Sequence, residues 1–359
     1  MAWQECNTLC GACPEGACVF RGDWTRKAAV AYLWVDGDHM AKAPTKPTID
    51  AVAIGRNEGA RLIACLESLK DVRRVVYVDS GSTDGSVEAA RAAGAVVVSL
   101  DLSVPFTAAR ARNAGLAVLA NDAPTYVQFI DGDCVLRDGW LKKAQQFLHD
   151  NLRAAVVCGR RRERHPEASV YNTLIDAEWN TPVGEAKACG GDALMRYQAI
   201  SAVKGYREDL IAGEEPELCL RLRARGWTVW RIDAEMTWHD AEITRFRQWW
   251  KRTERAGHAF AEGAARFSTP QNPHWTREVR RIWVWGLAIP IVALIGSLLH
   301  PAALALVLIY PLQVLRLSRG MGWKAALFNV LGKFPEAVGA IRFYARQLGK
   351  GEKRLIEYK

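Results

Sequence analysis

The stretch YVQFIDGDC, residues 126–134, places an apolar run directly before two carboxylates, Asp131 and Asp133, which flank a glycine. A buried strand ending in Asp-x-Asp would put both carboxylates at the carboxyl edge of a sheet, where a divalent cation carrying phosphates can bind. The same tripeptide is also typical of an ordinary Asp-Gly turn after a strand. The choice between a cation site and a turn depends on the rest of the chain.

Short apolar runs alternate with segments of helical spacing on both sides of this stretch. The expected strands are residues 49–55, 72–80, 95–100 and 126–130, and the expected helices are residues 58–69, 86–93 and 107–120. This alternation predicts an α/β fold with a doubly wound, Rossmann-like, mostly parallel sheet. Ligands of such sheets lie beyond the carboxyl ends of the strands. The polar clusters that follow three of these strands, residues 56–58, 79–84 and 131–133, therefore form the candidate site.

Two of these polar groups have more than one interpretation. Thr83 and Asp84 precede a helix and are expected to cap it, whereas Asp79 ends a strand and is expected to contact a base or a ribose. Arg110 and Arg112 lie near the start of the helix at 107–120. They are either solvated or, if they face the same sheet edge, bidentate ligands of a diphosphate.

The charge of the chain is unevenly distributed. Of its 359 residues, half are hydrophobic and 24% are charged, which excludes a disordered chain and a polytopic membrane protein. Residues 241–359 carry 19 Lys and Arg against 7 Asp and Glu, whereas residues 1–240 carry 29 against 32. The C-terminal third is therefore expected to meet an anionic surface. Its apolar segments favour a membrane over nucleic acid as that surface.

Nine cysteines are scattered along the chain, at positions 6, 10, 13, 18, 65, 134, 158, 189 and 219. The five later ones lie singly in apolar runs, which indicates reduced core thiols in a cytosolic compartment. The first three have the spacing of a radical-SAM cluster motif, but no barrel strand precedes them. We expect residues 1–47 to be a poorly ordered extension, with an iron–sulfur or zinc site as the alternative. Residues 1–20 lack the basic start and apolar core of a signal peptide.

Five groups of motifs, in this order, closely resemble the family 2 glycosyltransferases of GT-A fold. They are VDSGSTDG (78–85), ARARNAG (109–115), FIDGD (129–133), GGDALMR (190–196) with GYREDL (205–210), and GEEPELCLR (213–221) with Gly226, Trp227 and His239. The resemblance spans about residues 49–240. It implies an inverting transfer of a sugar from a nucleotide-diphosphate donor, with Mn²⁺ or Mg²⁺ as the cofactor.

The resemblance also implies a role for each matching residue. The donor would be contacted by Glu58, Asp79, Arg110, Arg112, Asn113 and Asp131. Asp133, together with Asp131 and His239, would ligate the cation. The acceptor would lie near Gly191 and Asp192, the latter standing where an asparagine is commoner in the family.

The general base is expected in the pair Glu214-Glu215. Glu215 occupies the place of the aspartate in the family's Glu-Asp pair, which keeps a carboxylate but lengthens it by a methylene. We favour Glu215 as the base, with Glu214 as the alternative. Acidic residues are also ordinary in the first turn of a helix, here residues 216–225, and a lone histidine such as His239 is often structural.

The segment after residue 240 mixes tryptophans with basic residues. Processive members of the family carry Gln-x-x-Arg-Trp here, but Arg252 lies four residues past Gln248 and no tryptophan follows it. This departure favours transfer of a single sugar. We expect Trp250 and Arg252 on the acceptor side, in a headgroup layer or at a lipid-linked phosphate, since nothing else supports a nucleic-acid surface.

Two uncharged apolar segments, residues 283–299 and 302–315, are joined by His300-Pro301. Basic residues flank the pair and none lies in the connector, which predicts a hairpin with both ends in the cytosol. Pro290 and Pro311 interrupt the segments, so a re-entrant or interfacial pair is one alternative. A core hairpin of a soluble protein is another.

These observations predict five parts. They are an extension (1–47), a GT-A domain (48–240), basic and aromatic interfacial helices (241–281), an apolar hairpin (282–317) and amphipathic C-terminal helices (318–359). The expected protein is a metal-dependent glycosyltransferase on the cytosolic side of the inner membrane, acting on a lipid-linked saccharide in cell-surface glycan assembly. The alternatives are a catalytically silent membrane scaffold and an iron–sulfur protein built on the N-terminal cysteines.

Overall fold

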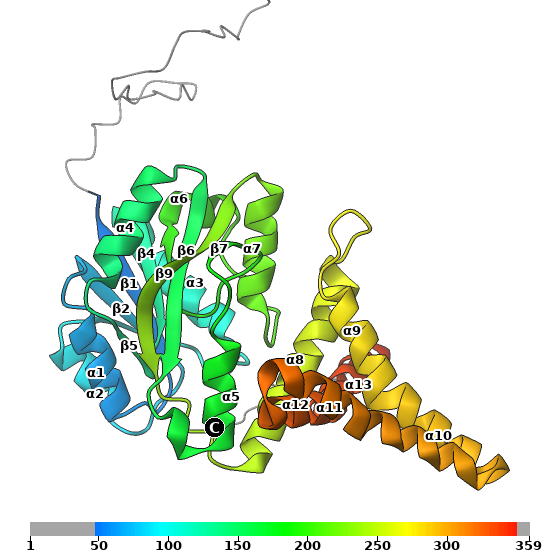
Figure 1. The fold of residues 1–359 in the computed structure, drawn as a ribbon. Coiled ribbons are helices and arrows are strands. Elements are labelled where there is room, and N and C mark those ends of the chain that lie inside the picture. Colours follow the sequence, from blue (N-terminus) through cyan, green and yellow to red (C-terminus); the bar gives the residue numbers. More distant parts are fainter. Residues whose placement is uncertain (1–46, 350–359) are drawn as a thin grey trace, which may run out of the picture. The chain divides into compact units, whose positions relative to one another are not determined.

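The computed structural model describes residues 47–349 (Figure 1). Residues 1–46 and 350–359 are not described. The expectations for the N-terminal extension, including a cluster at Cys6, Cys10, Cys13 and Cys18, lie outside the described residues and stay predictions.

A sheet of nine strands organises the first part of the described chain. The strands are β1 (Ile49–Gly55), β2 (Arg74–Asp79), β3 (Val96–Ser99), β4 (Tyr126–Asp131), β5 (Cys134–Leu136), β6 (Ala154–Glu163), β7 (Gly184–Ala186), β8 (Ala193–Arg196) and β9 (Thr228–His239). Their order is β3-β2-β1-β4-β8-β6-β9-β5, and β7 also pairs with β9. The α/β class is confirmed, and β1 to β4 pair in parallel as predicted. The other half is mixed, because β8 runs antiparallel to β4 and β6, and β5 and β7 run antiparallel to β9.

The central strands β1 and β4 are almost entirely buried, as expected for strands covered on both faces. Their register pairs Gly55 with Asp79 of β2 and Ile54 with Asp131 of β4. The polar residues that follow these three strands therefore meet at one edge of the sheet, as the sequence predicted.

Helices pack against the strands. They are α1 (Ala60–Ser68), α2 (Ser86–Ala92), α3 (Ala108–Leu119), α4 (Trp140–Asp150), α5 (Val170–Glu178), α6 (Tyr197–Ala202) and α7 (Glu214–Ala224). Helix α3 contacts β1 and β2, α4 contacts β6 and β9, and α5 contacts β6. Thr107 caps α3 by accepting a hydrogen bond from the Arg110 amide at 3.1 Å. A buried core that includes Tyr77, Phe129 and Trp140 joins the helices to the sheet.

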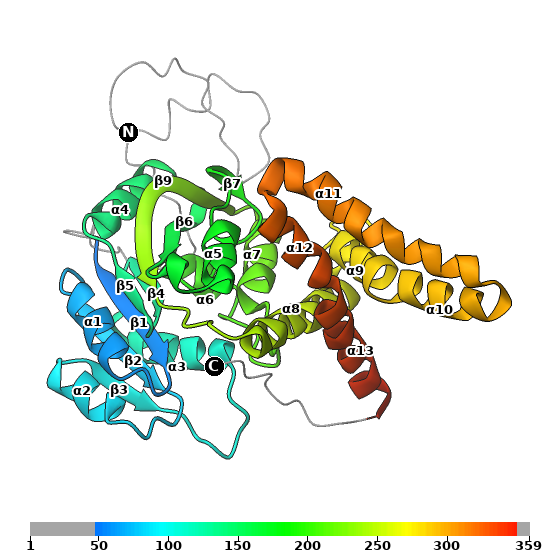
Figure 2. The ribbon, with the colours of Figure 1, turned by 60° about the horizontal axis from the view of Figure 1, so that its bottom comes forward.

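The rest of the described chain is helical (Figure 2). It comprises α8 (Phe246–Phe267), α9 (Thr276–Trp283), the π-helical turn η4 (Val284–Ala288), α10 (Ile289–Leu299), the 3₁₀ segment η5 (Pro301–Leu308), α11 (Ile309–Met321), α12 (Trp323–Leu331) and α13 (Lys333–Gly349). Helices α12 and α13 meet at Gly332, within the segment 318–359 for which amphipathic helices were predicted. Helix α8 packs closely on α13, with Gly257 against the backbone of Glu336 and Gly339 against the backbone of Glu254.

Two helices of the described chain are long and apolar enough to cross a membrane. They span Thr276–Leu299 and Pro301–Met321, with 24 and 21 residues. In the most apolar 18-residue stretch of each helix, the buried share is only 11% and 0%, respectively. A core hairpin of a soluble protein would be mostly buried, so this alternative is disfavoured.

Candidate active site

Two arginines converge on Asp131 at the end of β4. Nη2 of Arg112, from α3, lies 3.0 Å from Oδ1, and Nη2 of Arg161, from β6, lies 3.2 Å from Oδ2. Burial opposes the charge of Asp131, but the two guanidinium groups outweigh it and lower the pKa of this carboxyl. Asp131 is therefore held as an ion between two fixed cations.

Arg112 also joins Asp131 to the acidic start of α7. Its Nη1 lies 3.0 Å from Oε1 of Glu214 and 2.9 Å from Oε1 of Glu215. The Glu215 side chain is 14% exposed and the Glu214 side chain 6%. Burial, followed by the neighbouring charge of Glu214, raises the pKa of Glu215 to about 7. A carboxyl with this pKa suits proton transfer near neutral pH.

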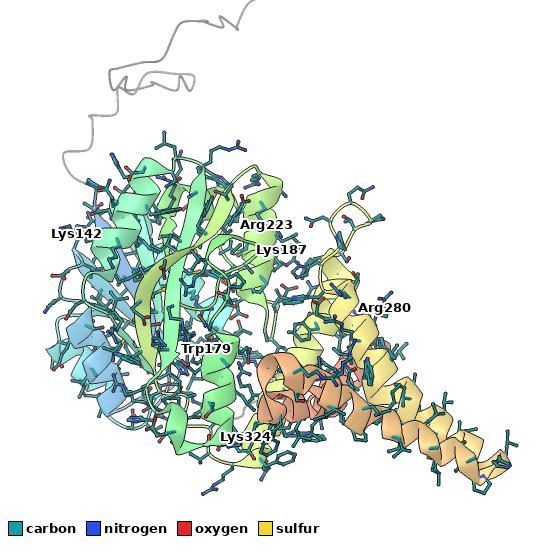
Figure 3. The ribbon with its side chains drawn as sticks, in the orientation of Figure 1. Lys142, Trp179, Lys187, Arg223, Arg280 and Lys324 are labelled. Atoms are coloured by element: carbon teal, nitrogen blue, oxygen red, sulfur yellow. The ribbon has the colours of Figure 1, made fainter. Side chains whose placement is uncertain are left out.

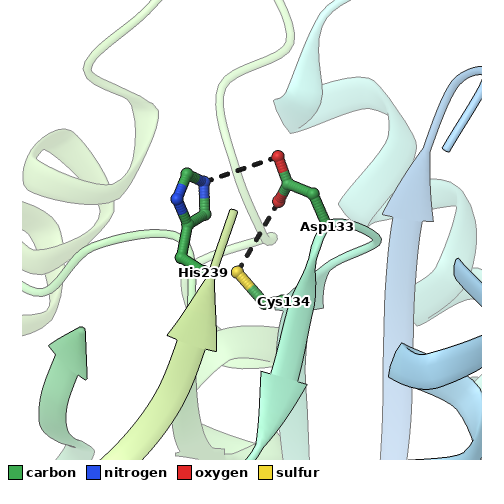
Figure 4. A group of neighbouring side chains, drawn as sticks. All are labelled: Asp133, Cys134 and His239. Atoms are coloured by element: carbon green, nitrogen blue, oxygen red, sulfur yellow. Dashed lines mark hydrogen bonds and ion pairs between the residues drawn. The ribbon is translucent and has the colours of Figure 1, made fainter. Parts of the chain in front are cut away.

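A second group of side chains lies at the neighbouring ends of β5 and β9 (Figure 4). Cys134 pairs with His239 across these antiparallel strands. His239 Nε2 lies 3.4 Å from Oδ2 of Asp133, and the Cys134 thiol lies 3.6 Å from Oδ1 of Asp133. Strand β9 runs as far as His239, and this length brings the imidazole to Asp133.

These side chains fit a divalent cation of the manganese type. One ligand atom each from Asp133, Cys134 and His239 lie within 4.8 Å of one another. Carboxylate oxygen and imidazole nitrogen both suit Mn²⁺, whereas burial raises the pKa of the Cys134 thiol and keeps it protonated. Nδ1 of His239 faces Glu163 Oε2 at 3.4 Å, the carboxylate support typical of a ligating histidine. Asp133 and His239 are thus the best candidate ligands.

Asp192 lies beneath this site rather than beside an open surface. It is 1% exposed and accepts hydrogen bonds from the Asp131 amide at 3.0 Å and from Thr237 Oγ1 at 2.8 Å. It also pairs with Arg161 Nε at 3.5 Å. In the structure Asp192 supports the end of β4. The acceptor-side role predicted for it stays a prediction.

Gly191 allows the arginine–aspartate pair to lie close to its backbone. A Cβ atom there would approach Arg112 Nη2 to 2.6 Å and Asp131 Oδ2 to 2.8 Å. Gly191→Ala is therefore expected to displace this pair and lower the melting temperature by several degrees, as thermal unfolding would measure. Gly190→Ala is the matched control, because a Cβ at Gly190 meets nothing within 4 Å. Equal melting temperatures for the two variants would contradict the prediction.

Asp79 and Glu58 lie at the predicted edge, with local partners. Oδ2 of Asp79 accepts hydrogen bonds from the amides of Gly81 and Ser82 at 2.9 and 3.0 Å, and Oδ1 accepts one from the Tyr77 hydroxyl at 3.1 Å. Glu58 pairs with Arg61 at 2.9 Å. The carboxylate of Asp79 closes its own turn, and the predicted base contact stays a prediction.

Arg110 and Asn113 hold loops instead of facing Asp131. The Arg110 guanidinium donates to the carbonyls of Asp101 and Val104 at 2.8 and 2.9 Å. The Asn113 amide donates to the Tyr206 carbonyl at 2.9 Å and accepts from the Tyr206 amide at 2.8 Å. Helix α3 turns these two side chains to the loops packed on it and Arg112 to Asp131. The donor contact predicted for Arg110 and Asn113 stays a prediction.

Trp250 and Arg252 lie apart from this group of side chains. Trp250 packs against Phe246, with ring centroids 5.8 Å apart. Arg252 forms a bidentate pair with Glu178 at the end of α5, at 2.9 and 3.0 Å. Arg252 thus links α8 to α5, whereas the contact of Trp250 with Phe246 lies within α8. The acceptor-side role predicted for both stays a prediction.

Three residues of the site belong to no motif of the sequence. Arg161 and Glu163 come from β6, and Trp179 follows α5. Trp179 is labelled in Figure 3. Its ring lies edge-on to His239 at 4.6 Å and under the Arg161 guanidinium at 4.7 Å. For Arg161 and Glu163, the feature of the sequence that could have indicated a site is the charged end, RRRE, of the otherwise apolar strand β6.

Comparisons with known proteins find similarity to glycosyltransferases. Residues 52–191 match the model of the family described as glycosyl transferase family 2. The chain is 28% identical over 235 residues to the pre-mycofactocin glycosyltransferases of two Mycobacterium tuberculosis strains, covering 62% of this chain and 49% of theirs. It therefore spans about half the length of these curated relatives. The mannosyltransferase PcManGT of Pyrobaculum calidifontis, solved with GDP-Man and Mn²⁺, has a similar fold, with TM-score 0.53, 17% identity and 86% and 89% coverage of this chain and that one. This likeness confirms the predicted GT-A fold.

Proposed function

We propose that this chain, whose residues 52–191 match the model of glycosyl transferase family 2, transfers one sugar from a nucleotide-diphosphate donor to an acceptor hydroxyl with inversion. One observation carries the proposal. Arg112 connects Asp131, beside the candidate cation ligands, to Glu214 and Glu215 at the start of α7. A candidate cation site and a candidate base thus surround a single buried guanidinium.

Glu215 is the proposed general base. It accepts the proton of the acceptor hydroxyl while that oxygen bonds to the anomeric carbon and the bond to the diphosphate breaks. Its raised pKa and its greater exposure support Glu215 over Glu214. Arg112 orients both carboxylates through its two short contacts.

Asp133 and His239, with Asp131 beside them, are the proposed holders of Mn²⁺ or Mg²⁺. When bound, the cation neutralises the charge that develops on the leaving diphosphate. The presence of GDP-Man and Mn²⁺ in the P. calidifontis enzyme of similar fold supports this assignment.

A panel of nucleotide sugars tests the proposed function. The full-length chain in detergent would be incubated with each donor and Mn²⁺, and the release of nucleoside diphosphate and the melting temperature would be measured. We expect one class of donor to be hydrolysed or transferred and to stabilise the protein in the presence of Mn²⁺. A chain that neither binds nor turns over any nucleotide sugar would overturn the proposal.

We further propose that the apolar hairpin enters the inner membrane with both ends in the cytosol, so that the acceptor is a lipid-linked saccharide. Basic residues precede the hairpin at Arg277, Arg280 and Arg281 and follow it at Arg316, Arg319 and Lys324, and none lies in the connector. Arg280 and Lys324 lie on the helices that lead into and out of the hairpin (Figure 3). This distribution and the exposed apolar surface between the two groups support membrane insertion.

Charges in the middle of the first apolar segment are expected to prevent insertion. Val292 and Leu294 are 56% and 67% exposed. Replacing both with glutamate is expected to move most of the protein from the membrane to the soluble fraction, because each charge costs about 2.5–3.5 kcal/mol at the centre of a membrane helix. Leu152→Glu, on a similarly exposed leucine (74%) after α4, is the control. A double variant that stays in the membrane fraction would contradict the proposed insertion.

A further inference from the structure

The loop that precedes the acidic pair, residues 204–213, is held from two directions. On one side, Thr107 donates to the Glu208 carbonyl at 3.2 Å and Asn113 bonds to the backbone of Tyr206. On the other side, α8 holds the loop: Arg255 donates to the Ile211 carbonyl at 3.1 Å, and Arg266 pairs with Asp209. The loop is therefore shared between α3 and α8.

The contact nearest to the acidic pair comes from Trp275. Gly213 is the N-cap of α7, directly before Glu214, and has a left-handed φ of +85°. A Cβ atom on Gly213 would lie 2.8 Å from Cη2 and 3.0 Å from Cζ3 of Trp275. The indole thus lies against the backbone from which both candidate bases project.

The indole itself is fixed by its neighbours. It packs on Gly263 of α8, lies at right angles to Phe260 with centroids 5.1 Å apart, and lies 4.3 Å from the His274 ring. The Trp275 backbone has φ +55°, a conformation that a bulky side chain rarely adopts. Packing of the indole into the corner between α8 and α9 compensates for this conformation, so the ring has one well-defined position.

Trp275 also marks a boundary in the chain. It is the N-cap of α9, and the first candidate membrane helix, Thr276–Leu299, begins at the next residue. A single side chain therefore connects the start of this helix with the start of α7.

We propose that Trp275 is a positioning residue that sets the place of Glu214 and Glu215 by packing on Gly213. The proposal rests on the proposed function for the chemical role of the two glutamates. The candidate cation ligands Asp133 and His239 lie at β5 and β9, outside α7 and its loop. Loss of the indole should therefore disturb the base while leaving the donor site in place.

We expect loss of the indole to lower kcat much more than it changes the KM for the donor. A shift of about 1 Å in a catalytic group is sufficient to reduce the rate about 10²-fold. Trp275→Ala is expected to lower kcat by about this factor and to leave the KM for the donor within about twofold, since the candidate cation ligands lie outside α7 and Asp131 still holds Arg112.

The experiment compares Trp275→Ala with Trp275→Phe, which keeps an aromatic ring against Gly213, in the full-length chain in lipid nanodiscs. Trp323→Ala on α12 is the matched control, because this tryptophan is 64% exposed. Hydrogen–deuterium exchange over residues 209–217 is measured beside kcat and KM. We expect this segment to exchange faster than in the wild type in Trp275→Ala, to a smaller extent in Trp275→Phe, and at the wild-type rate in Trp323→Ala. The exchange of β4 should be unchanged in all three variants.

Two results would overturn the proposal. The first is unchanged exchange and kcat in Trp275→Ala, and the second is a loss of donor affinity as large as the loss of kcat. If Trp275→Ala does not fold, the same measurements are made on Trp275→Phe. Exchange rates and a kcat equal to those of the wild type in that variant would contradict positioning by the indole. If the wild-type chain transfers no sugar, the proposed function fails, while the exchange of residues 209–217 still decides whether Trp275 holds the start of α7.

Discussion

Replacing Asp133 with alanine is expected to reduce sugar transfer about 10³-fold and to abolish tight binding of Mn²⁺. The variant removes the carboxylate that lies 3.4 Å from His239 and leaves the imidazole as the remaining strong ligand at this point. A bound cation contributes several kcal/mol to the stabilisation of charge in the transition state, and each 1.36 kcal/mol is a factor of ten in rate. Initial rates with the preferred donor and calorimetric titration with Mn²⁺ would measure both effects.

The control for this variant is Asp138→Ala, because Asp138 is an exposed aspartate five positions later in the chain. It is expected to keep its activity and its affinity for Mn²⁺. If sugar transfer in membranes that contain Asp133→Ala were as fast as in membranes that contain the wild type, the transfer would be the work of another membrane component, and the enzyme interpretation would be wrong. A catalytically silent membrane scaffold would then be the better description of the protein.

Glu215→Gln is expected to lower kcat by about 10²- to 10⁴-fold, the usual contribution of a general base. Glutamine keeps the shape of the side chain and an oxygen that can accept from Arg112, but it cannot take a proton. Glu214→Gln is the matched comparison, since both carboxylates lie about equally close to Arg112, at 3.0 and 2.9 Å. A larger loss in Glu214→Gln than in Glu215→Gln would assign the base to Glu214.

The pH dependence follows from the same residue. The pKa of Glu215 is raised from 4.5 to about 7, chiefly by burial and then by Glu214, so the base is ionised only above neutral pH. We expect kcat/KM to rise between about pH 5.5 and 8 with its midpoint near 7. Protonated Glu215 favours the folded state, a contribution present below about pH 4.5 and lost as the pH rises through about 7. A pH–rate profile that is flat across this range would exclude Glu215 as the base.

Much of the site was predictable because its residues follow regular strands. In a parallel sheet, the carboxyl ends of strands meet at one edge whatever their separation in the chain, so Asp131 and Asp133 were expected near the turns after β1 and β2. The pair Glu214-Glu215 was recognised from its motif at the start of a helix. The alternation of strands and helices likewise predicted the α/β class, and long uncharged segments predicted the exposed apolar hairpin.

The direction of individual side chains was not predictable. Arg110, Arg112 and Asn113 lie within four residues of one another on α3, yet only Arg112 faces Asp131. A helix turns each residue by about 100°, so the partners of these side chains depend on which loops pack against α3. The antiparallel placement of β8, which brings Asp192 under Asp131, is likewise a property of the whole sheet.

The sequence by itself determined the fold class, the edge of the sheet that carries the acidic residues and the family that they resemble, because these depend on local patterns. Only the tertiary structure decided that Arg112 and Arg161 hold Asp131 between them, that β9 extends far enough to bring His239 to Asp133, and that Trp275 lies against Gly213. These contacts join residues separated by 19 to 106 positions. They arise from packing between elements, which no periodicity within one segment of the chain records.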